Sequence, residues 1–103
     1  MKVRYYIYQL PITNSNIFIP IENVKNFNLK DYVPVWTDET FIEDFSETEL
    51  KKVCEVLFET FNTIHPKNFA GHSMSVSDVI EFNYNEKSQI FYCDSCGFVK
   101  IMR

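Results

Sequence analysis

The stretch from Ser46 to Ile64 constrains the fold most, because its apolar residues recur at the spacing of an α-helix. Ser46 is a good N-cap, and Glu49 three residues later completes a capping box. Pro66 ends the helix at about Ile64. We therefore predict one main helix over residues 47–64. Its apolar positions form one stripe: Leu50, Val53, Cys54, Leu57, Phe58, Phe61 and Ile64. Because a single helix cannot bury such a stripe alone, it must lie on another element.

Several short segments have the residue pattern of β-strands and can supply that element. Val3 to Leu10 alternates between two faces. Residues 79–84 and 89–93 form a hairpin around a turn at 85–88, and Phe98 to Met102 has the pattern of a further strand. We predict an α+β fold, with a mostly antiparallel sheet of four to five strands and the helix packed on one face.

The segment between the first strand and the helix has a weaker pattern. Residues 21–28 fit one or two helical turns. Tyr32 to Thr37 is rich in β-forming residues, but Pro34 cannot donate a hydrogen bond to a neighbouring strand. We therefore place this segment at an edge of the sheet or at a bulge. Residues 38–45 are acidic and aromatic, and we expect a loop there.

Length and cysteine content limit the class of protein. At 103 residues the chain is long enough for one domain, residues 1–103. Its three cysteines are an odd number, and the N-terminus has no features of a signal peptide. We therefore expect reduced thiols and a location in the cytoplasm of a host bacterial cell. No apolar run approaches the roughly 20 residues that span a bilayer, so we expect no membrane contact.

Two runs in the C-terminal half resemble a family signature. They read GHSMSVSDVI (Gly71 to Ile80) and FYCDSCGFVKI (Phe91 to Ile101), and FNTIHPKNFAGHS leads into the first. Together with RYYIYQL (Arg4 to Leu10), they resemble the YodL-like domain, so residues 1–103 are identified as a single YodL-like domain. That resemblance implies an origin in conjugative elements, plasmids or phages of Firmicutes. The family more often has a bulky apolar residue where this chain has Cys96.

The polar residues of this signature have two interpretations. A histidine beside serines and acids could be part of a catalytic site, with His72 as its centre. A histidine after a glycine in a polar loop is more often a structural hydrogen-bonding residue. We therefore favour a structural loop in which His72 and the serines tie residues 71–78 to the turn at 94–97, with no catalytic residue. Its members are Gly71, His72, Ser73, Ser75, Asp78, Asp94 and Gly97.

Cys93 and Cys96 have the spacing of one knuckle of a zinc ribbon. A structural zinc needs four ligands, and the other candidates are Cys54, His65 and His72. Cys54 lies on the apolar stripe of the helix and fits poorly. A redox pair would need a helix N-terminus to lower a thiol pKa, whereas these cysteines follow a hairpin. We therefore expect packing thiols, no metal and no cofactor.

Negative charge is concentrated in one segment. Residues 31–49 hold seven of the 14 acids and no Lys or Arg, whereas the rest of the chain holds all 10 bases. The net charge of −4 opposes direct nucleic-acid binding, which normally needs a basic face. The predicted partner-binding residues are Trp36, Asp38, Glu39, Phe41, Glu43, Asp44 and Phe45. Their carboxylates would match basic groups of a partner protein and their rings would anchor it. The alternative is a solvated acidic loop whose rings dock onto the core.

The expected function follows from resemblance and charge together. The chain is similar to small anti-CRISPR proteins of Firmicutes mobile elements. That resemblance implies a non-enzymatic inhibitor that binds a type II CRISPR effector nuclease and blocks guide RNA loading or DNA binding. One alternative is an interaction or regulatory module of a conjugative element or phage with another host partner. A third is an enzyme, such as a nuclease acting on guide RNA at His72. A homodimer through an edge strand also stays open.

Overall fold

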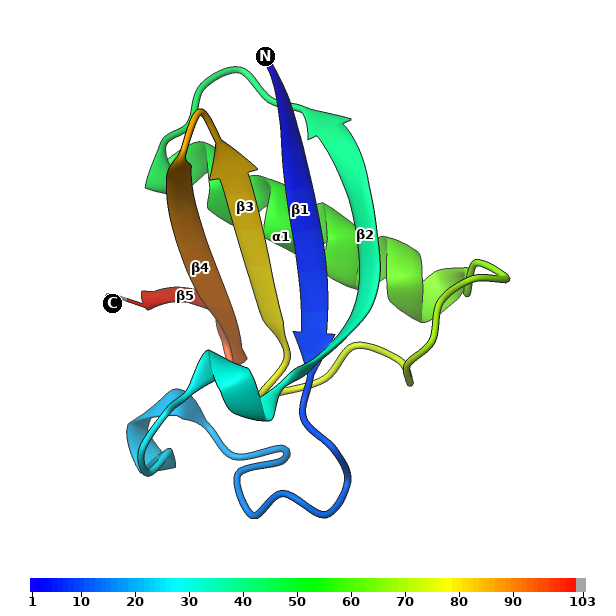
Figure 1. Cartoon of the computed structure of the whole chain (residues 1–103), viewed down its shortest axis with the longest axis vertical. Coiled ribbons are helices and arrows are strands. Elements are labelled where there is room, and N and C mark those ends of the chain that lie inside the picture. Colours follow the sequence, from blue (N-terminus) through cyan, green and yellow to red (C-terminus); the bar gives the residue numbers. More distant parts are fainter. Residues whose placement is uncertain (102–103) are drawn as a thin grey trace.

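The expected helix forms and lies across one face of a five-stranded antiparallel sheet (Figure 1). This computed structural model describes residues 1–101. Helix α1 is Glu47–Thr63, and the strand order in the sheet is β2-β1-β3-β4-β5. The strands are β1 Lys2–Gln9, β2 Val33–Phe41, β3 Val79–Tyr84, β4 Lys87–Asp94 and β5 Gly97–Ile101. The predicted α+β class is confirmed. Of the predicted last strand, Met102 lies outside the described residues.

The start of α1 uses the predicted cap in a modified form. The Ser46 side chain accepts a hydrogen bond from the Glu49 backbone N–H at 3.2 Å, as expected. The Glu49 carboxylate does not complete the capping box, because it accepts from the backbone N–H of Glu43 at 3.0 Å. The Ser46 N–H donates instead to Asp44 Oδ1 at 3.1 Å. The helix end is therefore held by the connecting segment as well as by its own first turn.

One core lies between α1 and the sheet. Leu50 and Cys54 of the helix are fully buried, and they pack in one cluster with Val3, Ile7 and Phe82. Ile64, which we placed on the apolar stripe, is 66% exposed because the helix ends one residue earlier and Ile64 is its C-cap.

A second, smaller core lies on the other face of the sheet, at one end. The segment between β1 and β2 lies at the lower end of the sheet in Figure 1 and contributes Leu10 and Tyr32. These side chains pack with Val79 and Tyr92 of the sheet. In place of the predicted helical turns the segment has two 3-10 turns, Ile21–Asn23 and Leu29–Asp31.

Strand β2 is an edge strand with a bulge; the sequence predicted an edge or a bulge around Pro34, and the structure has both. The register to β1 shifts between Ile7 and Tyr8, so that Ile7 faces Trp36 and Tyr8 faces Pro34. The predicted loop at 38–45 is wrong in its first half, because β2 continues to Phe41. Most of this run is exposed, with Trp36 and Thr40 half-buried, as expected for the outer strand of a sheet.

The burial of Leu50 between helix and sheet predicts how much this side chain contributes to the free energy of unfolding. We expect Leu50→Ala to lower the free energy of unfolding by about 2–5 kcal/mol, because it removes a fully buried side chain and leaves a cavity. Val56→Ala on the same helix is the control, since Val56 is 61% exposed and should change stability by less than about 0.5 kcal/mol. Urea unfolding followed by circular dichroism measures both. Equal effects of the two substitutions would contradict the assigned helix face.

Candidate functional site

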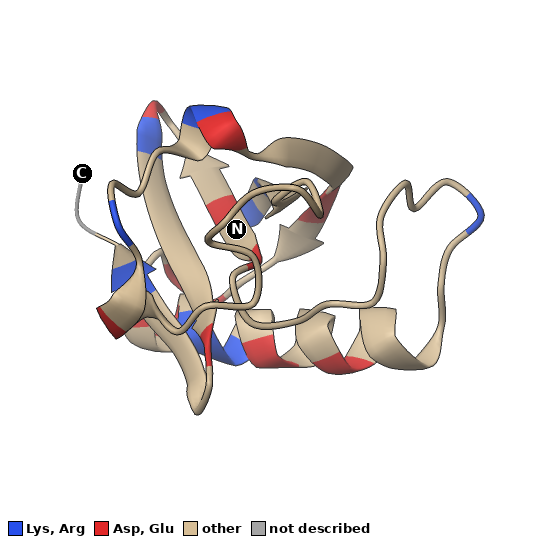
Figure 2. Cartoon of the chain, turned by 90° about the horizontal axis from the view of Figure 1, so that it is seen from below, with Lys and Arg blue, Asp and Glu red and all other residues tan. Residues whose placement is uncertain are grey.

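The two carboxylates on β2 point to opposite faces of the sheet. Asp38 pairs with Tyr5 and Glu39 pairs with Arg4. Residues directly opposite in an antiparallel pair share a face. Tyr5 is buried in the core with α1, so Asp38 lies on the helix side of the edge and Glu39 on the other side. Acidic and basic segments are interspersed over the molecule (Figure 2).

The charges of these two carboxylates are balanced differently. Glu39 lies 3.5 Å from the Lys2 ammonium and 3.6 Å from the Arg4 guanidinium. Asp38 forms no ion pair among the described residues, and its Oδ1 accepts the backbone N–H of Glu39 at 2.7 Å. Asp38 is exposed. Its negative charge is therefore the more available of the two to a partner.

Glu43 and Asp44 lie in the connection that crosses the end of the sheet from β2 to α1 (Figure 1). Both are exposed. Asp44 accepts the Ser46 N–H, so it also supports the start of the helix. The Glu43 side chain has no such structural bond among the described residues, which leaves its carboxylate free to meet a partner.

Two of the three predicted aromatic anchors pack against the core. Trp36 contacts Phe61 and stacks on Phe69, and its indole N–H donates to the Tyr5 hydroxyl at 3.1 Å. Phe45 is half-buried. The third, Phe41, is 76% exposed. Phe41 is therefore the one of the three predicted aromatic anchors whose ring is exposed to a partner.

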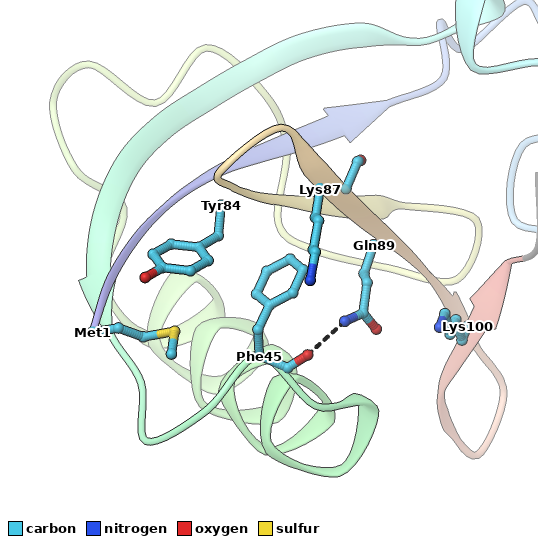
Figure 3. Close-up of a pocket in the computed structure, with 7 residues that line it drawn as sticks. Met1, Phe45, Tyr84, Lys87, Gln89 and Lys100 are labelled. Atoms are coloured by element: carbon cyan, nitrogen blue, oxygen red, sulfur yellow. Dashed lines mark hydrogen bonds between the residues drawn. The ribbon is translucent and has the colours of Figure 1, made fainter.

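Phe45 faces a different part of the molecule from β2. Its ring lies by Tyr84 in an open pocket of about 640 Å³, and its carbonyl accepts from Gln89 Nε2 at 2.8 Å (Figure 3). Lys87 and Lys100 also line this pocket. Sequence reasoning missed the pocket, because its residues come from distant segments that only the hairpin and the helix start bring together.

The Gln9 side chain holds residues 71–78, which we call the signature loop, by hydrogen bonds to His72 and Asp78. Sequence reasoning missed this role of Gln9. Gln9 is buried at the end of β1, and its Nε2 donates to the His72 carbonyl at 2.9 Å and to Asp78 Oδ2 at 3.0 Å. Its Oε1 accepts the His72 backbone N–H at 3.1 Å. A Cβ at Gly71 would lie 2.0 Å from Gln9 Oε1. A larger residue at 71 would therefore push the Gln9 amide out of its hydrogen bonds.

The loop is tied to β4 by backbone groups and not by the predicted side chains. Ser77 donates its N–H to the Cys93 carbonyl at 3.0 Å, and Cys93 donates its N–H to the Asp78 carbonyl at 2.8 Å. Asp94 Oδ1 accepts from the N–H of Ile21, outside the loop. We predicted that residues 71–78 bond to the turn at 94–97. In the structure they bond instead to Cys93, next to that turn on β4. Gly97 has φ +119°, as its position in a turn requires.

The histidine and its serine neighbour lie on the exposed side of the loop. His72 Nδ1 bonds to the Ser73 carbonyl at 2.6 Å, and its ring contacts Phe18. The Ser73 hydroxyl meets His65 Nε2 at 3.1 Å. The Ser75 side-chain oxygen is buried and has no partner among the described residues, whereas its N–H donates to Asp78 Oδ2 at 2.9 Å.

Asp78 is the one carboxylate with a perturbed pKa among the described residues. Burial raises its pKa from 3.8 to about 6, although the bonds from Ser75 and Gln9 and the nearby His72 lower it. Its Oδ1 is buried without a partner. This carboxylate therefore costs the folded state free energy when it ionises.

The described residues contain no group of three or more His, Cys, Asp or Glu side chains that could hold a metal ion. Cys93 is buried on β4 and Cys96 is exposed in the turn that follows. Burial raises the pKa of the Cys93 thiol to about 12, and that of Cys54 is also raised by burial. Both thiols are therefore protonated at neutral pH. No helix between residues 1 and 101 is long and apolar enough to cross a membrane.

The fold and its buried loop network define a two-layer α+β domain with one helix on an antiparallel sheet. A profile of the YodL-like domain family matches residues 4–103. The chain therefore belongs to the YodL-like domain family. Searches of curated proteins and of solved structures found no match.

Buried Asp78 predicts a pH dependence of stability. Between about pH 4 and 6 the folded state holds a proton that the unfolded state has lost, so the stability contributed by Asp78 falls as pH rises through this window. Asp78→Asn removes this loss. Relative to wild type, the variant should gain up to about 3 kcal/mol in unfolding free energy between pH 4 and 7.

Urea unfolding at several pH values measures the difference between the two proteins. The control is Asp31→Asn, because Asp31 is exposed and its substitution should leave the pH profile unchanged. A constant difference between wild type and Asp78→Asn over this range would contradict the raised pKa.

Proposed function

We propose that this domain is a non-enzymatic binding module that docks onto a basic protein surface through its acidic edge. The acidic edge comprises Asp38, Glu39, Phe41, Glu43 and Asp44. The observation that carries the proposal is the exposed Asp38 carboxylate, free of ion pairs among the described residues, on the same strand as the exposed Phe41 ring. A carboxylate of this kind speeds encounter with a basic partner, and an exposed ring supplies binding energy once the ring is buried.

The partner that we propose is a type II CRISPR effector nuclease. Such nucleases hold the guide RNA–DNA duplex in a positively charged channel, which an acidic protein surface can occupy. The resemblance of the chain to small anti-CRISPR proteins of Firmicutes mobile elements supports this choice. Inhibition would be stoichiometric, and it would block guide RNA loading or DNA binding.

The surroundings of the loop favour binding over catalysis. His72 lies on the exposed side and bonds to the carbonyl of its neighbour Ser73, whereas the Asp78 carboxylate accepts from Gln9 and the Ser75 N–H. The histidine ring and the buried carboxylate thus serve separate hydrogen bonds. An enzyme that used them together would need a different arrangement of this loop.

Charge reversal tests the acidic edge. We expect the double variant Asp38→Lys, Glu43→Lys to weaken inhibition of target-DNA cleavage at least tenfold. The reason is that the introduced lysines would be repelled by the basic surface of the partner. The control is Glu22→Lys with Glu59→Lys, which changes the net charge equally at exposed positions away from the acidic edge. A cleavage assay titrated with each protein measures the effect. Equal losses in both double variants would show that net charge alone matters.

His72→Ala separates an inhibitor from an enzyme. A stoichiometric inhibitor should keep full inhibition in this variant and should reach it near a one-to-one ratio to the effector. An enzyme should lose activity in the variant and, as wild type, should inhibit well below that ratio. Co-elution with guide-free and guide-bound effector then identifies the blocked step. If wild type neither co-elutes with the effector nor inhibits it, an interaction module with another partner replaces this proposal.

A further inference from the structure

Strand β2 has one neighbour, β1, so half of its backbone groups face outward. The start of this outer side is covered, because Ala70 donates its N–H to the Val35 carbonyl at 3.2 Å. No backbone hydrogen bond from another segment of residues 1–101 reaches the outer side of Thr37 to Phe41. We name this run of five residues the open edge. An open edge is a template for pairing with a further strand.

One outward donor of the open edge is occupied by a side chain of the same strand. The Glu39 backbone N–H donates to Asp38 Oδ1 at 2.7 Å. The N–H therefore does not take part in the pairing with β1, and the Asp38 carboxylate lies where a docking strand would place a carbonyl. A carboxylate in this position discourages indiscriminate pairing. A cationic side chain that binds this carboxylate would release the N–H for a new ladder.

A second copy of the chain is a poor occupant of the open edge. In an antiparallel pairing of two copies through Thr37 to Phe41, Asp38 or Glu39 comes opposite or next to its own equivalent. Like charges at such positions destabilise the pair. Upstream of this run, the bulge beside Pro34 breaks the alternation of faces, so a longer self-pairing would be out of register. The negative charge of the open edge thus disfavours a second copy of this chain and favours a basic segment as the pairing strand.

One pocket lies at each end of the open edge. Beside its start, Tyr6, Pro34, Trp36 and Asn68 help to line a pocket of about 530 Å³. At its far end, Phe41 and Ile42 help to line a smaller pocket of about 330 Å³ that contains two carboxylates, Glu43 and Glu49. The first pocket suits an apolar or aromatic side chain and the second a cationic one. The run between them is about 16 Å long at the rise of a strand.

We propose that the open edge accepts an extended, basic segment of a partner protein as a sixth strand. The segment would carry an apolar side chain toward the Trp36 end and a lysine or arginine toward the Glu43 end. A further cation would bind Asp38 and free the Glu39 N–H. This mode rests on the proposed docking function and specifies how the acidic edge meets its partner.

A pair of substitutions at Glu39 separates backbone pairing from charge. Glu39→Gln removes the charge and keeps the N–H. Glu39→Pro removes both, and proline is tolerated on an edge strand where the N–H faces solvent. We expect Glu39→Gln to keep partner affinity within about threefold and Glu39→Pro to lose at least tenfold. Hydrogen exchange of the β1 amides checks that the sheet is intact in both.

The first probe is a capped heptapeptide of alternating valine and lysine. We expect it to perturb and protect the backbone amides of Thr37 to Phe41 in NMR spectra at millimolar concentration or below. The same peptide with N-methylated backbone, and a version with glutamate for lysine, should not bind. Shifts confined to other elements, or equal binding by Glu39→Gln and Glu39→Pro, would overturn the strand-addition mode.

The second probe is the guide-free effector nuclease, which distinguishes this inference from the proposed function. If the peptide binds the open edge and the effector does not bind the protein, the effector is the wrong partner and the strand-addition site stands. If the effector binds wild type, Glu39→Gln and Glu39→Pro equally, the docking function stands and the strand-addition site is overturned. If neither probe binds, both proposals fall.

Discussion

Burial of the apolar face of α1 against the sheet is the interaction on which the rest of the structure depends. Leu50 and Cys54 are fully buried against strand residues such as Ile7 and Phe82, and neither layer could bury these side chains alone. Because β1 contributes buried residues to this core, its register with β2 fixes which face each β2 residue takes. The opposite directions of Asp38 and Glu39 on β2 are a consequence of that register.

The polar residues of the loop before β3 support the same architecture. Gln9 links β1 to this loop through His72 and Asp78, and the loop in turn bonds the end of β4 through its backbone. Three segments distant in the chain are thereby held at one end of the sheet. The raised pKa of Asp78 shows that burial here outweighs the two hydrogen bonds that its carboxylate accepts. Most polar groups of this loop therefore have a structural partner, whereas the Ser75 hydroxyl and Asp78 Oδ1 are buried without one among the described residues.

The elements with strong local patterns could be predicted, and the exceptions have specific causes. The helix, the hairpin and the edge position of Pro34 follow from spacing, turn residues and a missing donor. The continuation of β2 to Phe41 could not be predicted, because its acidic residues are poor strand formers and only pairing with β1 stabilises them. The inward packing of Trp36 and Phe45 depends on tertiary neighbours, so the expected aromatic surface is reduced to Phe41.

By itself the sequence determined the α+β class, the length and apolar face of the helix, and the presence of an acidic segment before it. These properties arise from local periodicity and composition, which each residue carries wherever it lies. Only the tertiary structure decided which carboxylates keep their charge free, because Glu39 meets Lys2 and Arg4 across the sheet while Asp38 does not. It also decided that Gln9 is the partner of the loop, since a hydrogen bond between residues 69 positions apart depends on how the strands align.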